Sequence, residues 1–149
     1  MKLLTLALVA ALAGLSGAVH AQQVGGGGAG AAPGTPYHLS GGTTAGTNST
    51  SIKGSAGVLY HVVAINPTAT LAYLRLYDSA TAPTCSSATG VRHVYPVPAN
   101  TSGAGFVIPT AGPAGEAYVN GIGFCVTGAG GDTDMTNAPA GVFVEASYH

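Results

Sequence analysis

The chain has 149 residues and carries little charge, with four Lys or Arg against five Asp or Glu and a formal net charge of −1. A chain of this length has room for one domain. Apart from Lys2, its cations are Lys53, Arg75 and Arg92, which are too few and too scattered to neutralise a run of phosphates. The composition therefore excludes a nucleic-acid partner.

Residues 1–21 are predicted to be a secretory signal peptide. Lys2 supplies a short positive region, residues 3–15 form an apolar region too short to span a bilayer as a helix, and Val19 and Ala21 provide small side chains at a cleavage site. We expect cleavage after Ala21, which leaves no membrane span in the mature chain. A buried N-terminal helix or an uncleaved membrane anchor is the alternative.

Residues 22–36 are nearly all Gly, Ala and Pro and are predicted to be a flexible linker, because such a segment buries too little apolar surface to offset its ordering entropy. Gly25, Gly27 and Gly30 match the pattern G-x-G-x-x-G, but a dinucleotide site needs a strand before them and a helix after them. Here a cleavage site precedes and a proline follows, so no cofactor is expected. The remaining residues 37–149 suffice for one β-sandwich domain.

Short apolar runs closed by Gly, Pro, Asn or Ser recur along this domain, and the rhythm predicts an all-β fold. Residues 58–65 and 71–77 flank a turn at Asn66 and Pro67 and are expected to pair as antiparallel strands. A total of about seven to eight strands predicts a single jelly-roll-like antiparallel β-sandwich. The other expected strands are residues 51–53, 91–97, 106–108, 117–120, 122–127 and 142–148.

Cys85 and Cys125 are the only cysteines, and an even pair that follows an export signal predicts a disulfide. Closing a loop of about 40 residues would stabilise the fold by about 3–4 kcal/mol in the chain-entropy model. Two reduced thiols are expected only if the chain is not exported. A cysteine-based metal site is not expected, because the sequence has no C-x-x-C or H-x-x-x-H spacing.

The histidines of the mature chain do not predict a catalytic site. His61 lies within an apolar strand and His93 follows Arg92, and we expect both to be hydrogen-bonded structural residues. Nothing in the spacing of His38 or His149 selects a Ser or Thr partner, and neither G-x-S-x-G nor H-E-x-x-H occurs. The sequence predicts no enzyme; a general base at His61 or His93 is the alternative.

The Gly-rich loop at residues 128–139 carries Asp132 and Asp134 among Thr and Asn residues, which together offer oxygen ligands for Ca²⁺. The loop lacks the EF-hand spacing and a bidentate Glu. An Asp in a Gly-rich connection usually accepts hydrogen bonds from its own backbone. We therefore predict no metal, with Asp132 and Asp134 as weak candidates.

Tyr73, Arg75 and Tyr77 are expected to project from one face of their strand, with Tyr60 near them. Tyr and Arg anchor many protein interfaces, since they cover a large area with little loss of entropy. These four residues are therefore candidates for contacts between copies of the chain. Two alternatives are a tyrosine stripe that closes the core of the sandwich and a glycan bound by the same aromatic rings.

Four segments follow one another between residues 51 and 148: SIKGSAGVLYHVVAINPTATLAYLRLYDSATAPT, VYPVPANTSGAGFVIPTAGPAGEAYVNGIGFCVTG, GDTDMT and VFVEASY. In this order they resemble small all-β structural proteins of tailed bacteriophages and prophages. The matching motifs include the IK and LY of the opening strands, the DTD loop and the final Tyr148. These motifs are structural, and none is a catalytic signature.

The resemblance implies a virion component, such as a capsid decoration or fibre-like protein, that binds copies of itself and a capsid or surface lattice. The export signal and the pair of Cys85 and Cys125 lie outside the family pattern. They favour the alternative of an exported bacterial β-sandwich protein, secreted, periplasmic or on the cell surface. Such a protein would self-associate or bind a surface ligand such as a glycan.

Overall fold

The computed structural model describes residues 34–101, 105–109 and 114–149, which include the two cysteines and every expected strand. The expected signal peptide and nearly all of the expected linker lie outside the described residues. Within the described residues the chain has no helix long and apolar enough to cross a membrane. Nine strands are present there: β1 (Thr35–His38), β2 (Thr50–Lys53), β3 (Gly57–Ile65), β4 (Ala72–Asp78), β5 (Val91–Val97), β6 (Gly105–Pro109), β7 (Glu116–Tyr118), β8 (Ile122–Thr127) and β9 (Phe143–Tyr148).

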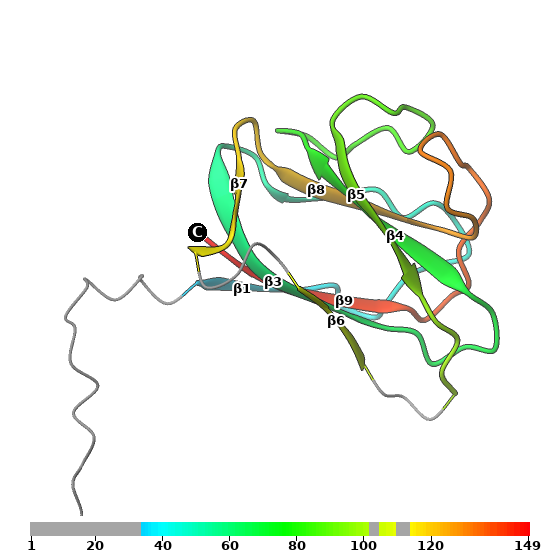
Figure 1. Ribbon diagram of the computed structural model, residues 1–149. Coiled ribbons are helices and arrows are strands. Elements are labelled where there is room, and N and C mark those ends of the chain that lie inside the picture. The colour runs from blue at the N-terminus through cyan, green and yellow to red at the C-terminus, as the bar shows by residue number, and fades with distance from the viewer. Residues whose placement is uncertain (1–33, 102–104, 110–113) are drawn as a thin grey trace, which may run out of the picture. The chain divides into compact units, whose positions relative to one another are not determined.

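The strands form two antiparallel sheets that pack face to face (Figure 1). Sheet A has the order β1-β9-β3-β6, and sheet B has the order β2-β8-β4-β5. Strand β7 pairs with the start of β3 and β6 with its remainder, so the two share one position at the edge of sheet A. With β6 and β7 counted as one position, this is the strand order of an eight-stranded jelly roll. The predicted all-β, jelly-roll-like sandwich is confirmed.

Strand β1 is the element that the sequence did not indicate. It begins at Thr35, inside the range expected to be linker, and pairs along its whole length with β9, from Thr35 opposite Tyr148 to His38 opposite Glu145. Because β1 is an edge strand that pairs on one side only, it can accommodate Pro36, which has no N–H to donate. The folded domain therefore begins before Tyr37.

The expected pairing of the strands on either side of Asn66 was wrong. Strand β3 pairs with β6, β7 and β9 in sheet A, whereas β4 pairs with β5 and β8 in sheet B. The connection between them crosses from one sheet to the other and is held by Asn66, whose buried side-chain amide donates to Thr70 O at 2.8 Å and Val97 O at 3.0 Å. These two bonds satisfy the amide while the chain turns from sheet A into sheet B.

The core lies between the two sheets and is built from alternate residues of the central strands. Leu59, Val62 and Ala64 of β3 face this core, and Tyr37 of β1 packs edge to face on Phe124 with ring centroids 5.9 Å apart. Strand β8 is buried on both faces. Its outward face must therefore be covered by other parts of the chain. The large, fully buried aliphatic residues of sheet B are Leu74, Leu76, Val97, Ile122 and Val126.

Two long loops supply this cover for sheet B. The β4–β5 loop is joined to β8 by the disulfide between Cys85 and Cys125, which confirms the predicted pairing. The β8–β9 loop lies over the same face, and both loops are seen beside sheet B in Figure 1. Sheet A has no such cover among the described residues, so the two outer faces of the sandwich differ.

Candidate functional site

Arg75 projects from β4 toward the outer face of sheet B, and its side chain has a relative exposure of 0%. The guanidinium contacts main-chain oxygens of both covering loops and no carboxylate among the described residues. A buried guanidinium is tolerated only when its N–H groups are hydrogen-bonded, and here most are. Its Nη1 donates to Cys85 O (2.9 Å), Gly131 O (3.0 Å) and Asp132 O (2.5 Å), and its Nη2 donates to Asp134 O (2.6 Å), while Nε has no partner.

The predicted interface of Tyr60, Tyr73, Arg75 and Tyr77 is corrected by these positions. Arg75 and Tyr77 are fully buried beneath the covering loops, because residues on the outer face of β4 are covered by the chain itself. Tyr73 is partly exposed and packs on Gly130 of the β8–β9 loop, where a Cβ would lie 2.7 Å from its ring. Tyr60 lies in sheet A, away from the other three. The four residues do not form one surface.

Of the two aspartates in the β8–β9 loop, Asp134 stabilises the loop with its carboxylate, whereas Asp132 contributes its main-chain oxygen to Arg75. The Asp134 carboxylate accepts hydrogen bonds from the Thr136 hydroxyl at 2.7 Å and from Ala129 N–H at 3.1 Å. Burial acts to raise the pKa of Asp134, but the hydrogen bonds from Thr136 and Ala129 outweigh it and hold the pKa below its ordinary value. No three His, Cys, Asp or Glu side chains come together for a metal within the described part of the chain. The oxygens of this loop surround Arg75 instead.

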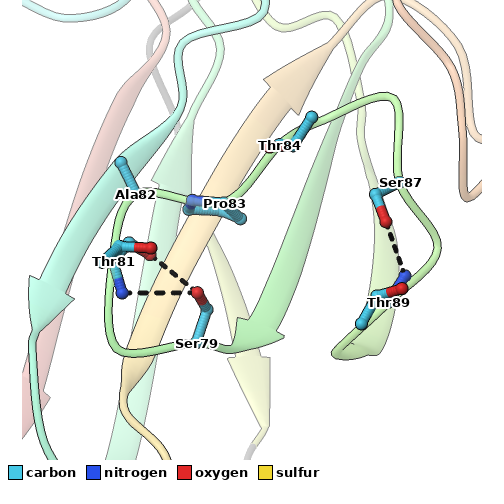
Figure 2. A pocket seen from close by; sticks show the side chains of 7 residues that line it. All are labelled: Ser79, Thr81, Ala82, Pro83, Thr84, Ser87 and Thr89. Atoms are coloured by element: carbon cyan, nitrogen blue, oxygen red, sulfur yellow. Dashed lines mark hydrogen bonds between the residues drawn. The ribbon is translucent and has the colours of Figure 1, made fainter.

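A hollow opens beside the β4–β5 loop, with a volume of about 310 Å³ (Figure 2). We call it the hydroxyl hollow, because five of its seven lining residues carry a hydroxyl group and none carries a charge. Hydrogen bonds within the loop shape it. The lining consists of Ser79, Thr81, Thr84, Ser87 and Thr89 with Ala82 and Pro83.

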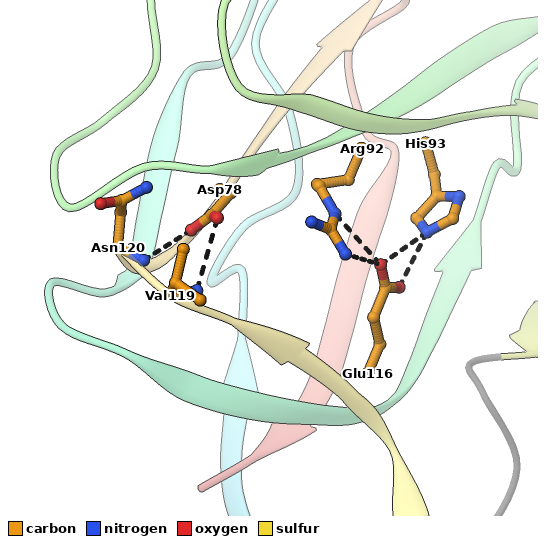
Figure 3. A network of polar contacts seen from close by, with 6 residues as sticks. All are labelled: Asp78, Arg92, His93, Glu116, Val119 and Asn120. Carbon is orange, nitrogen blue, oxygen red and sulfur yellow. Dashed lines mark hydrogen bonds and ion pairs between the residues drawn. The ribbon is translucent and has the colours of Figure 1, made fainter.

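A polar cluster joins the edges of the two sheets (Figure 3). Arg92 and His93 point from β5 in sheet B toward Glu116 of β7 in sheet A. Arg92 donates to Glu116 Oε1 from Nε at 3.3 Å and from Nη2 at 3.1 Å, and His93 Nε2 lies 2.8 Å from both carboxylate oxygens. Because a carboxylate only accepts hydrogen bonds, His93 Nε2 carries the proton. The hydrogen bond expected for His93 is present, and both oxygens of Glu116 are occupied.

Two aromatic rings pack against this cluster. His93 stacks on Tyr95 with centroids 5.4 Å apart, and the guanidinium carbon of Arg92 lies 5.6 Å from the ring centre of Tyr118. The Tyr118 hydroxyl is buried and makes no hydrogen bond of ordinary length, although the Glu116 carboxylate lies near enough to affect it. Burial, followed by the charge of Glu116, raises the pKa of Tyr118 far above its ordinary value of 10.0. Tyr118 therefore stays neutral in the folded protein.

Replacing Tyr118 with Phe is expected to leave the free energy of unfolding at pH 7 unchanged or to raise it by up to about 1 kcal/mol, since the variant loses a buried hydroxyl that makes no hydrogen bond of ordinary length. The wild type should lose stability as the pH rises above about 10, because Tyr118 ionises in the unfolded state before it does in the folded state. In the Tyr118→Phe variant this alkaline loss of stability should be smaller. Urea unfolding at pH 7 and above about pH 10 measures the loss, and Tyr73→Phe, at a partly exposed site, is the control. An unchanged alkaline loss would contradict the assignment.

Asp78, at the end of β4, fixes the turn between β7 and β8 (Figure 3). Its carboxylate accepts hydrogen bonds from the backbone N–H groups of Asn120 at 2.7 Å, Gly121 at 3.3 Å and Val119 at 3.4 Å. Burial acts to raise the pKa of Asp78, and these bonds, aided by the charge of Arg92, lower it further than burial raises it. Together with Glu116, Asp78 ties the β7 segment to sheet B.

On the outer face of sheet A, the described side chains are alternate residues of the three adjacent strands β1, β9 and β3. Val63 and Ile65 of β3 lie opposite Glu145 and Phe143 of β9, and all of these side chains are partly or fully exposed. His38 of β1 extends the face, since its Nδ1 lies 3.1 Å from Glu145 Oε1 and its ring stacks on Phe143 with centroids 6.4 Å apart. This face mixes apolar and ionisable side chains.

His61 also lies on this outer face, opposite Ser147, and is exposed. The expectation that it is a hydrogen-bonded residue of an apolar strand is corrected, because alternation along β3 places Val62 in the core and His61 in solvent. His38, His61 and His93 therefore lie on the surface or at the sheet edge. None of their hydrogen bonds among the described residues involves a Ser, Thr or Cys side chain.

Sequence reasoning missed the cluster around Glu116 and the hydroxyl hollow. The only signal for the first was that Arg92, His93 and Glu116 are among the few ionisable residues of the chain. The signal for the second was the run of Ser and Thr between Ser79 and Thr89. Comparison with known proteins adds no assignment: no family model, curated protein or solved structure matches the chain.

Proposed function

We propose that the chain is a non-enzymatic structural module that assembles with further copies of itself through the outer face of sheet A. The observation that carries the proposal is the difference between the two outer faces of the sandwich. In sheet B that face is closed by two loops, a disulfide and the buried Arg75. In sheet A the described residues leave Val63, Ile65 and Phe143 partly exposed.

The chemistry of this face suits a second copy of the same chain. Apolar side chains on the outer face of a sheet provide area that is favourable to bury. The described residues of this face carry one carboxylate, Glu145, together with the imidazoles of His38 and His61. A two-fold axis that sets Glu145 of one copy against His61 of the other would make the pairing self-complementary. The low net charge of −1 adds little repulsion between copies.

The absence of catalysis in this proposal is supported by how the ionisable groups are used. Glu116 is bound by Arg92 and His93, and the Asp78 and Asp134 carboxylates hold turns. A general base needs a proton within hydrogen-bond reach and a nucleophile or water to activate. His38 and His93 pair with Glu145 and Glu116 rather than with a hydroxyl or thiol.

The disulfide between Cys85 and Cys125 supports assembly outside the cytoplasm. Disulfides persist in oxidising compartments, so the pairing supports an exported module of the periplasm or cell surface, and it is less usual for a virion protein that folds in the cytoplasm. A phage-like decoration protein remains the reading that the motif order supports. The exported module and the decoration protein would have the same function, which is to bind copies of the chain and a lattice.

Sedimentation velocity over a range of concentrations tests the proposal. The wild-type chain is expected to associate reversibly, and Ile65→Lys should raise the dissociation constant at least about tenfold, because it places a charge in the apolar part of the interface. Val119→Lys is the matched control, since Val119 is 73% exposed on the β7–β8 turn. A wild type that stays monomeric at about 0.5 mM would overturn the proposal, as would equal effects of both variants.

A further inference from the structure

The hydroxyl hollow is held in shape before any ligand binds. The β4–β5 loop that lines it is closed by the disulfide at Cys85. Ser79 Oγ donates to Thr81 O at 2.8 Å and accepts from Thr81 N–H at 3.4 Å, and Ser87 Oγ accepts from Thr89 N–H at 3.1 Å (Figure 2). A loop with this many internal bonds loses little further freedom on binding, which favours a preformed site.

Three hydroxyl groups of the hollow are left for a ligand. The side chains of Thr81, Thr84 and Thr89 are exposed, and within the described part of the chain their hydroxyls make no hydrogen bond. Each hydroxyl can donate one hydrogen bond and accept two. Pro83 is buried and Ala82 is exposed, so the hollow also offers a small apolar area between the hydroxyls.

The lining selects the chemical class of the ligand by what it lacks. No Lys, Arg or His lines the hollow, which disfavours phosphates and carboxylates, and no Asp or Glu lines it, which disfavours cations. An apolar ligand would leave the threonine hydroxyls unpaired. An uncharged ligand with many hydroxyl groups of its own satisfies them and fits a volume of about 310 Å³. We propose that the hydroxyl hollow binds neutral carbohydrate.

This site lies on the loop that covers sheet B, so it is separate from the outer face of sheet A. Without an aromatic ring in the lining for a sugar to stack on, the affinity should be modest, with dissociation constants on the order of 1 mM. Binding at that level becomes effective when several copies are assembled on one surface, because the sites then act together. The proposal that the hollow binds carbohydrate nevertheless does not depend on self-association.

The test is titration of the isotope-labelled full chain with maltose, lactose, cellobiose and diacetylchitobiose, followed by amide NMR. At least one disaccharide is expected to shift the amide signals of residues 79–90 with saturation at about 10 mM. The double variant Thr81→Val with Thr84→Val keeps the side-chain shape and should weaken binding at least about tenfold. Co-sedimentation with insoluble cellulose and chitin distinguishes a polymer ligand from a free sugar.

Two further variants keep the outcome interpretable. Ala82→Leu fills the hollow from an exposed position and should abolish binding without removing a hydroxyl. Thr133→Val, at an exposed position in the β8–β9 loop, should leave binding unchanged. The proposal is overturned if none of the four sugars shifts these amides, if the shifts map to another surface, or if Thr133→Val weakens binding as much as the double variant does.

Discussion

Replacing Arg75 with Ala is expected to lower the free energy of unfolding by about 3–5 kcal/mol, because the change leaves buried carbonyl groups without donors and opens a cavity. The guanidinium holds the carbonyls of both covering loops at once. Its loss should therefore release the β8–β9 loop as well as the region around Cys85. Urea unfolding gives the loss of stability, and hydrogen exchange locates it.

Two variants separate the hydrogen bonds of the Arg75 guanidinium from the effect of its charge. Arg75→Lys retains the charge but has a single nitrogen with three N–H donors, so it cannot bond all four carbonyls and should recover only part of the loss. Arg92→Ala removes an arginine whose side chain is 43% exposed, and it should cost about 0–1 kcal/mol. If Arg75→Ala lost no more stability than Arg92→Ala, the anchoring role would be wrong.

Removal of the disulfide should have the second largest effect. Cys85 and Cys125 lie 40 residues apart in the sequence, and the double variant Cys85→Ala with Cys125→Ala is expected to lose about 3–4 kcal/mol through the greater freedom of the unfolded chain. The β4–β5 loop should also become more open to proteolysis, because the crosslink fixes it to β8.

The control for this change is the wild-type chain unfolded in reductant, which should match the double variant to within about 1 kcal/mol. Agreement between the two samples separates the loss of the crosslink from the small cavity left by two alanines. A double variant as stable as the oxidised wild type would contradict the expected stabilisation by the crosslink between Cys85 and Cys125.

The strands were predictable because their residues alternate and because Gly, Pro and Asn separate them. Residues 91–97 and 122–127 were predicted with the bounds that β5 and β8 have. The assignment of β3 and β4 to different sheets was not predictable in this way. Two consecutive strands show the same alternation of apolar residues whether they pair within one sheet or lie in opposite sheets. Strand β1 was missed because its four residues include Pro36 and follow a Gly-rich segment.

The candidate site was harder to predict than the fold. The cysteine pair could be predicted from export and an even count. The burial of Arg75 and Tyr77 could not be predicted, because an outward position on a strand implies exposure only if no loop covers it. The sequence does not show where a long loop folds back. Glu116 meets Arg92 and His93 only because β5 and β7 lie at the same edge of the sandwich.

Isotope-filtered NMR on a mixture of labelled and unlabelled chains tests the central claim of assembly through sheet A most directly. At about 0.5 mM the methyl groups of Val63 and Ile65 are expected to show contacts with protons of an unlabelled copy, and the contacts of Val63 should vanish in Ile65→Lys. The absence of such contacts would contradict the account, as would intermolecular contacts that arise only from Val119 or Met135, which are exposed elsewhere on the domain.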